Sequence, residues 1–180
     1  MIDQWPRYEV FKQDREGGPI RNVGSVHAPD EELALGNARD VFARRPACVA
    51  LWVIPATDIV SQTMEQRDSA LPEPDDFLGE PGAFAVFSKQ SHRQLMTYVD
   101  YVGTVQARSS AEAIRQGHQA FGETAGIVWW ACPEESIRRS SSEEVAGYAA
   151  ATSKLFRMPN QYHTVFTMQQ IRRAEEGDES

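Results

Sequence analysis

The sequence predicts an α+β fold made of two tandem strand-strand-helix-strand repeats that pack as a pseudo-twofold internal dimer, followed by a C-terminal extended arm. The first observation is a repeated motif: Val23-Gly24-Ser25-Val26 returns as Val102-Gly103-Thr104-Val105. The offset is 79 residues here, and it becomes 78 for Trp52 and Trp130. The second observation is size, because a repeat with roughly 60 core-forming residues is marginal as an isolated unit. The two copies are therefore expected to pack on each other.

Alternating apolar residues and turn-forming residues predict the paired strands of each repeat. In the first repeat, Glu16-Gly17-Gly18-Pro19 predicts a tight turn because glycine supplies positive φ at little cost. The expected strands are Arg7–Gln13 and Ile20–Ala28 in the first repeat, with Ala83–Lys89 and Leu95–Gln106 in the second. The near-continuous apolar runs Val49–Ile54 and Ile127–Cys132 predict a buried third strand in each copy.

The helix of each repeat is predicted from apolar residues that recur at helical spacing. Asp30 can cap the first helix, and Ser109 with Glu112 forms a possible capping box for the second. The expected buried stripes are Ala34, Leu35, Ala38, Val41 and Phe42, and Ala113, Ile114, Gly117, Ala120 and Phe121. A short helical turn is expected after Pro55 and after Pro133.

Strand order and domain boundaries follow from these elements. A right-handed crossover places strand one between strands two and three, which then run parallel, and the two units can join edge to edge. We expect a first repeat over 1–63, a Pro- and acid-rich linker over 64–82, and a second, diverged repeat over 83–139. A C-terminal docking arm and charged tail occupy 140–180.

Composition narrows the function classes. The 18 basic and 26 acidic residues give a formal net charge of −8, which argues against nucleic acid or an anionic membrane as partner. The sequence has no apolar run long enough for a membrane span and no pattern of a signal segment. Cys48 and Cys132 stand alone, as is typical of buried cysteines in a reducing compartment. We therefore expect a cytoplasmic protein.

Motifs for catalysis or for a cofactor are missing from the sequence. The histidines His27, His92, His118 and His163 occur in no metal-binding spacing. The sequence also has no nucleophile elbow, phosphate-binding loop, dinucleotide fingerprint or Cys-x-x-Cys. We predict no catalytic residue, no metal and no cofactor in this chain.

The candidate functional residues are instead partner contacts. His27 ends a strand just before a helix, and its counterpart is Gln106. For the consecutive rings of Trp129 and Trp130, which are expected to point to opposite faces of the sheet, core packing is the default explanation and anchoring an interface is the alternative. Trp52 and Trp130, at equivalent positions of the two repeats, are the predicted contacts. In the tail, the predicted contacts are Arg157, Pro159 and Tyr162, since an extended arm with basic and aromatic anchors is typical of a docking segment. A tail folded over its own sheet explains these residues equally well.

The motifs together resemble the B subunit of bacterial phenylacetyl-CoA epoxidase. The resemblance rests on Trp5–Phe11, Val23–Asp30, Ala34–Asp40 and Trp52–Ala56 of the first repeat, and on Lys154–Tyr162 of the tail. It implies a non-catalytic bridging subunit of a multicomponent oxygenase that acts on aromatic acyl-CoA thioesters in phenylacetate degradation. The implied partners are a di-iron catalytic subunit and its structural paralogue. Members of this family carry one repeat and pair as a dimer, whereas this chain carries a second copy and is expected not to self-associate further.

Two other function classes stay open at this point. One is a cofactor-free α+β oxygenase or isomerase that uses His27 or Tyr98 as an acid-base group in a pocket between sheet and helix. The other is a regulatory module in which Arg157 recognises an acyl-CoA ligand.

Overall fold

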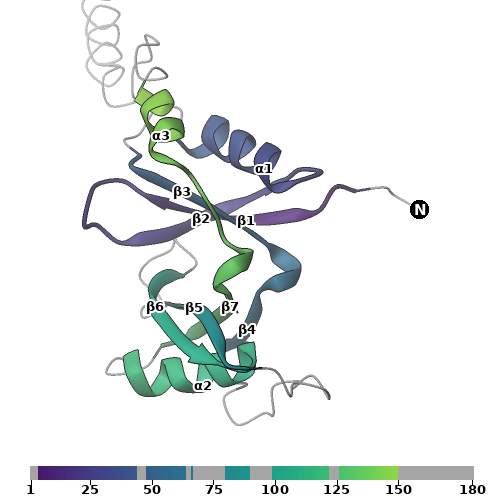
Figure 1. Cartoon of the computed structure of the whole chain (residues 1–180), viewed down its shortest axis with the longest axis vertical. Helices are drawn as coiled ribbons and strands as arrows, with labels where there is room; N and C mark the ends of the chain where they lie inside the picture. The colour runs from purple at the N-terminus through teal and green to yellow at the C-terminus, as the bar shows by residue number, and fades with distance from the viewer. Residues whose placement is uncertain are drawn as a thin grey trace, which may run out of the picture.

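A computed structural model describes residues 4–43, 48–63, 66, 80–89, 99–121 and 126–149. The strands are β1 (Arg7–Gln13), β2 (Ile20–His27), β3 (Ala50–Pro55), β4 (Val60–Thr63), β5 (Gly82–Lys89), β6 (Asp100–Ala107), β7 (Val128–Pro133) and β8 (Arg138–Arg139). The helices are α1 (Glu31–Ala38), α2 (Ser110–Phe121) and α3 (Ser142–Ala149), with a π-helical turn η1 (Arg39–Ala43) and 3-10 turns η2 (Ala56–Asp58) and η4 (Glu134–Ser136). Figure 1 shows their arrangement, which is an α+β fold as predicted.

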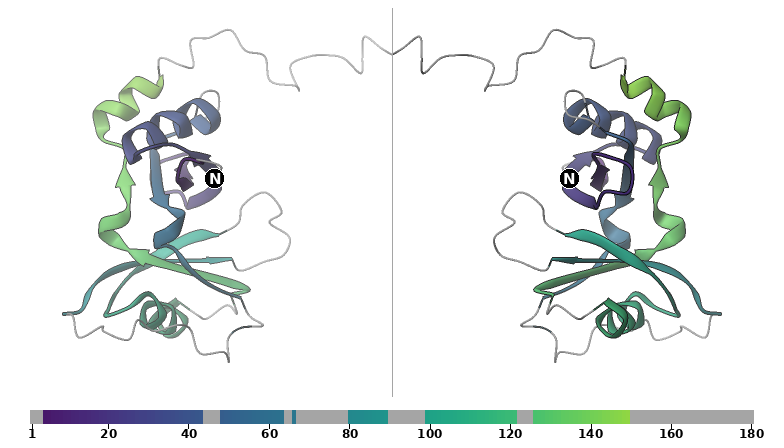
Figure 2. Two further views of the ribbon diagram at one scale, coloured as in Figure 1. Left: turned by 90° about the vertical axis from the view of Figure 1, so that its right-hand side faces the viewer. Right: turned by 90° about the vertical axis from the view of Figure 1, so that its left-hand side faces the viewer.

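All eight strands belong to one antiparallel sheet in the order β4-β7-β5-β6-β2-β1-β3-β8. We call β1, β2, α1 and β3 the first half, and β5, β6, α2 and β7 the second half. As predicted, β1 lies between β2 and β3, and β5 lies between β6 and β7. The halves meet where Arg21 of β2 pairs with Asp100 of β6. In Figure 2 the two halves are stacked, with α1 and α2 on opposite outer faces.

Strands β4 and β8 were not predicted from the sequence, and each of them pairs with the opposite half. β4 follows the first half along the chain but pairs with β7. β8 follows the second half but pairs with β3, next to Ser140, whose N–H donates to the Leu51 carbonyl at 2.8 Å. They were missed because they have only four and two residues and carry no apolar alternation.

The repeated glycines have a packing role. Gly24 and Gly103 have φ values of 136° and 155°, a region that side chains other than glycine rarely adopt. A Cβ on Gly24 would lie 3.0 Å from Phe42, and a Cβ on Gly103 would lie 2.5 Å from Phe121. In both halves, a phenylalanine from the helical segment therefore covers the glycine of the second strand.

One part of the predicted helix stripe is wrong. Val41 is 64% exposed and Ala120 is also exposed, although both were expected to be buried. The neighbouring Phe42 and Phe121 pack against the two cores. Because consecutive helix residues point about 100° apart, a phenylalanine that covers the sheet directs the preceding side chain toward solvent.

The apolar residues form three clusters. One cluster lies under α1 and includes Tyr8, Leu35 and Val53, while another lies under α2 and includes Ile114 and Trp129. The third, which we call the central cluster, lies where the helix-free faces of the two halves meet. It contains Phe11, Trp52, Phe87, Trp130 and Cys132. Trp129 and Trp130 therefore point to opposite faces of β7, as expected for consecutive strand residues.

The predicted helix caps are present. The Leu33 N–H donates to Asp30 Oδ1 at 2.8 Å, and the Glu112 N–H donates to Ser109 Oγ at 3.1 Å. Glu112 departs from a standard capping box because its carboxylate accepts from the N–H of Arg108, one residue before the cap. Both cysteines are free thiols, and burial raises the pKa of Cys132 to about 12.

Candidate functional site

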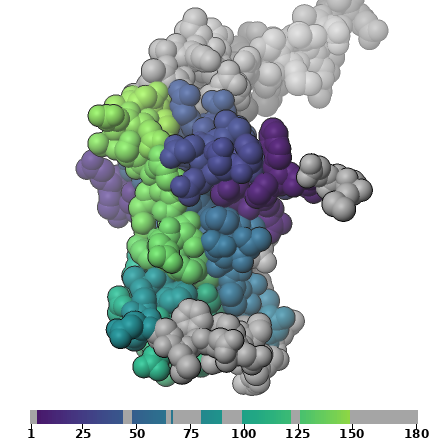
Figure 3. Space-filling model, turned by 45° about the vertical axis from the view of Figure 1, so that its right-hand side comes forward, coloured from purple at the N-terminus to yellow at the C-terminus, as the bar shows by residue number. Residues whose placement is uncertain are grey.

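The exposed large hydrophobic residues of the described chain all lie in or beside the first half. They are Trp5, Leu33 and Val41, with exposed fractions of 58%, 46% and 64%. Figure 3 shows the N-terminal strand and α1 next to each other on one face of the molecule. We call Trp5, His27, Leu33 and Val41 the first-half surface.

His27 connects the strand side of this surface to the helix side. Its Nε2 lies 3.3 Å from the Gln4 side-chain nitrogen, and its carbonyl accepts from Asn37 Nδ2 at 3.1 Å. It pairs with Arg7 at the end of β2, which brings it close to Trp5. The predicted partner contact is therefore exposed, and it borders the apolar residues of the surface.

Leu33, Asn37 and Val41 follow one another at intervals of four residues along α1 and η1, so they share one helix face, which we call the stripe of the first half. Exposed carboxylates lie at both ends of this face, with Asp30 and Glu31 at the start of α1 and Asp40 in η1. An apolar centre with a charged rim is the usual organisation of a protein–protein contact.

The corresponding face of the second half is polar. At the offset of 79 residues, Glu112, Gln116 and Ala120 occupy these positions on α2. Gln116 Nε2 donates to Glu112 Oε1 at 3.1 Å, and Glu112 Oε2 accepts from the Arg108 N–H at 2.8 Å. These hydrogen bonds, the Arg108 N–H first, hold the pKa of Glu112 below its ordinary value, so the carboxylate is charged at neutral pH.

Trp52 and Trp130 lie in the central cluster, each with 9% of its surface exposed. The Arg139 guanidinium lies 4.6 Å from the Trp52 ring centroid, and Tyr101 packs edge-on against the same ring at 5.2 Å. Trp130 packs edge-on against Phe11 at 6.4 Å. In the free chain these rings hold the two halves together, and contact with an external partner stays a prediction.

The remaining candidates cannot be placed. Arg157, Pro159 and Tyr162 lie outside the described residues, as does Tyr98. The proposed docking arm therefore stays a prediction from sequence.

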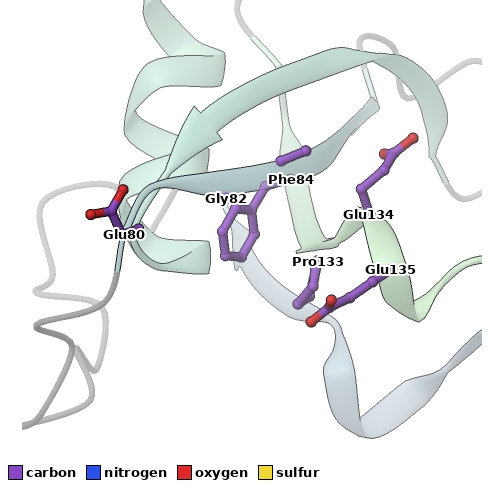
Figure 4. A pocket seen from close by; sticks show the side chains of 7 residues that line it. Glu80, Gly82, Phe84, Pro133, Glu134 and Glu135 are labelled. Carbon is purple, nitrogen blue, oxygen red and sulfur yellow. The ribbon is translucent and has the colours of Figure 1, made fainter.

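A pocket of about 530 Å³ opens between the start of β5 and η4. It is lined by Glu80, Gly82, Ala83, Phe84, Pro133, Glu134 and Glu135. In Figure 4, Phe84 and Pro133 lie at its centre, with Glu80 on one side and Glu134 and Glu135 on the other. Three carboxylates disfavour an anionic ligand such as a CoA thioester. His27 is not among the lining residues, so this pocket does not match the predicted acid-base site.

Neither a metal cluster nor a membrane helix is found in the part of the chain that the structure describes. No group of three or more His, Cys, Asp or Glu side chains there could hold a metal ion. No helix within the same ranges is long and apolar enough to cross a bilayer.

An ion-pair network joins three elements at the top of the first half. Arg138 of β8 donates to Glu32 of α1 at 2.8 Å and to Glu144 of α3 at 2.9 Å. Glu144 also accepts from the Ser141 N–H, while its own N–H donates to Ser141 Oγ, which makes a complete capping box. These interactions, the Ser141 N–H first, hold the pKa of Glu144 below its ordinary value.

We expect Glu144→Ala to lower the free energy of unfolding by about 1–2 kcal/mol at about pH 7, because it removes both the cap and the ion pair. A lowered folded-state pKa means that the carboxylate stabilises the fold above its ordinary pKa of 4.5 and loses this effect as the pH falls through the folded value. Urea denaturation across this acid range should show a smaller loss of stability in the variant than in the wild type. Glu144→Gln is the matched control, since its amide oxygen keeps the bond from Ser141; equal pH dependence in all three proteins would contradict the prediction.

Of the first-half surface, only His27 was a candidate from the sequence, and its contact with a partner stays a prediction; Trp5, Leu33 and Val41 were not candidates. Leu33 was detectable in principle, because it lies outside the apolar stripe of its helix. Val41 was wrongly assigned to the core. Recognising it as exposed requires knowing which face the helical segment turns toward the sheet.

The comparisons with known proteins agree with the resemblance. Residues 4–76 match the family model described as phenylacetic acid degradation B. Over 63 residues the chain is 48% identical to the B subunit of 1,2-phenylacetyl-CoA epoxidase from Escherichia coli strain K12. This match covers 35% of the chain and 66% of the relative, slightly less than two thirds of its length. No solved structure matches the chain. Residues 4–76 of this chain are therefore similar to the phenylacetic acid degradation B family.

Proposed function

We propose that this chain is a non-catalytic bridging subunit of a multicomponent di-iron oxygenase that acts on aromatic acyl-CoA thioesters, as in phenylacetate degradation. The observation that carries the proposal is the 48% identity over 63 residues to the B subunit of an epoxidase, together with the family match over residues 4–76, which include the first half. The exposed apolar first-half surface supports it, because large hydrophobic side chains exposed in one region mark interaction sites.

We further propose that the chain is a covalently fused version of a subunit dimer, with tandem repeats related by a pseudo-twofold axis. The strand order supports this, since exchanging β1–β4 with β5–β8 reproduces the same order read from the other end. Two contacts add support, because residues at equivalent positions of two symmetric halves contact each other where the twofold axis passes between them. Phe11 meets Phe87 with ring centroids 4.4 Å apart, and Arg21 lies 3.5 Å from Asp100.

The proposed partners are the di-iron catalytic subunit and its structural paralogue, in the cytoplasm. The chain contacts them through the first-half surface and through Arg157, Pro159 and Tyr162 of the arm. The internal pseudo-dimer replaces self-association.

Co-expression of the full chain with the di-iron subunit and its paralogue from the same genome tests the proposal. An affinity tag on this chain should recover both oxygenase subunits in a complex that survives size-exclusion chromatography. The control is the catalytic pair of an unrelated di-iron oxygenase, which should not be recovered. Elution of this chain alone, at concentrations of about 10 µM that sustain ordinary specific complexes, would contradict the proposal.

A further inference from the structure

We propose that, of the two equivalent helix faces, only that of the first half docks the oxygenase, so that together with the proposed arm it links the subunits of one catalytic heterodimer, where a symmetric subunit dimer would join two heterodimers. The inference rests on the proposed function. The occupant that the surface fits is an apolar patch with a basic rim on an oxygenase subunit.

The two helix faces that a symmetric dimer would present identically differ here in chemistry. On the first half, Leu33 and Val41 expose apolar surface on either side of Asn37. On the second half, Glu112 and Ala120 occupy the same two positions. The partner that buries Leu33 and Val41 would have to bury a carboxylate at the second site.

Burying Glu112 is unfavourable because the carboxylate stays charged and is not readily neutralised by protonation. The Arg108 N–H and the Gln116 side chain both donate to it, and its pKa is held low. An apolar partner patch would remove water from this carboxylate without offering a counter-charge, a cost that such a contact does not recover.

The strand side of the surface shows the same difference. Trp5 corresponds to Pro81 at the offset of 76 that relates β1 to β5, and His27 corresponds to Gln106 at the end of β6. Trp5 is the largest exposed ring of the described chain, and tryptophan is the residue type most often found at the energetic centre of an interface. The second half therefore lacks the tryptophan anchor as well as the exposed apolar residues that correspond to Leu33 and Val41.

Charge identifies the chemistry of the occupant. Asp30 and Glu31 lie at one end of the stripe, and Asp40, whose Oδ1 is 3.8 Å from Arg39 Nη1, lies at the other; all three carboxylates are exposed. Lys or Arg side chains around an apolar patch would complement this rim and would steer the encounter.

Native mass spectrometry of the complex reconstituted with excess catalytic heterodimer tests the valency directly. One heterodimer per chain is expected, and two per chain would overturn the inference while leaving the proposed function intact. Recovery of no complex at all would overturn the proposed function, and the inference with it.

Exchanging the stripes between the halves tests the location. Leu33→Glu with Val41→Ala places the second-half residues on the first half and should weaken binding at least tenfold. The helix should survive, because a glutamate near its N-terminus is favourable. Thr57→Glu is the matched control, because it introduces the residue found at the equivalent exposed position of the second half, Glu135. Thr57 lies in η2, outside the stripe, so affinity should be unchanged.

The reverse exchange should create a second site. Glu112→Leu with Gln116→Asn, Ala120→Val and Pro81→Trp, which also supplies the missing anchor, should raise the stoichiometry toward two heterodimers per chain, whereas Gln119→Leu, on another exposed position of α2, should not. Circular dichroism confirms that each variant is folded. Unchanged affinity after the first exchange, in a folded variant, would overturn the assignment of the surface.

Discussion

Replacing Phe87 with alanine is expected to lower the free energy of unfolding by about 3–5 kcal/mol, the usual cost of removing a fully buried aromatic ring. Phe87 is completely buried in the central cluster and packs against Phe11 at 4.4 Å. The cavity would open between the two halves, where β5 and β1 face each other. Since a domain of this size has a total stability of about 5–15 kcal/mol, this one change removes a large share of it. Urea denaturation followed by tryptophan fluorescence measures the loss.

Phe11→Ala should cost a similar amount, because Phe11 is also fully buried. The double variant should cost less than the sum of the two, since the first truncation already removes the ring contact. Leu33→Ala is the control, because it truncates a large side chain that is exposed. Loss of less than about 1 kcal/mol for Phe87→Ala would show that the central cluster does not hold the halves together.

Gly103→Ala is expected to lower the free energy of unfolding by about 3 kcal/mol or more. The backbone there has a φ of 155°, and the added Cβ would lie 2.5 Å from Phe121 Cζ. Both backbone strain and a clash with a ring that packs against the second-half core therefore oppose the substitution. Thermal denaturation gives the shift in Tm.

Gly24→Ala should act in the same direction with a smaller effect, since its Cβ would lie 3.0 Å from Phe42. Gly36→Ala is the matched control: Gly36 is exposed in α1, has no atom within 4 Å of the added Cβ, and should gain about 0.5–1 kcal/mol from helix propensity. A Gly103→Ala protein as stable as the wild type would mean that Phe121 does not pack on this strand.

Sequence periodicity was sufficient to predict the strands and helices that bury a full face. The predicted strand over Arg7–Gln13 is exact, and the helices begin where Asp30 and Ser109 cap them. Periodicity could not find β4 and β8, because their pairing is decided by partners about 70 and 90 residues away in the chain. It could not find η1 either, since a π-helical turn leaves no compositional signature.

The candidate surface was only partly predictable. His27 was identified because it ends a strand beside a helix cap. Val41 was missed because apolar residues in an amphipathic pattern are normally assigned to the core. Trp5 precedes the first predicted strand and was given no role from the residues alone. Exposure depends on what the rest of the fold leaves uncovered, and a single sequence does not contain that information.

The exchange of β4 and β8 has a consequence for synthesis on the ribosome. When residues up to 63 have emerged, β3 has no neighbour on its outer side, because Arg138 and Arg139 have not yet been made. The outer side of β2 is likewise open until Asp100 arrives. Both edges of the nascent first half therefore display unpaired backbone groups, which can pair with other chains. This sheet is complete only after Arg139 has been made, so slow elongation through the second half lengthens the time during which the chain can aggregate.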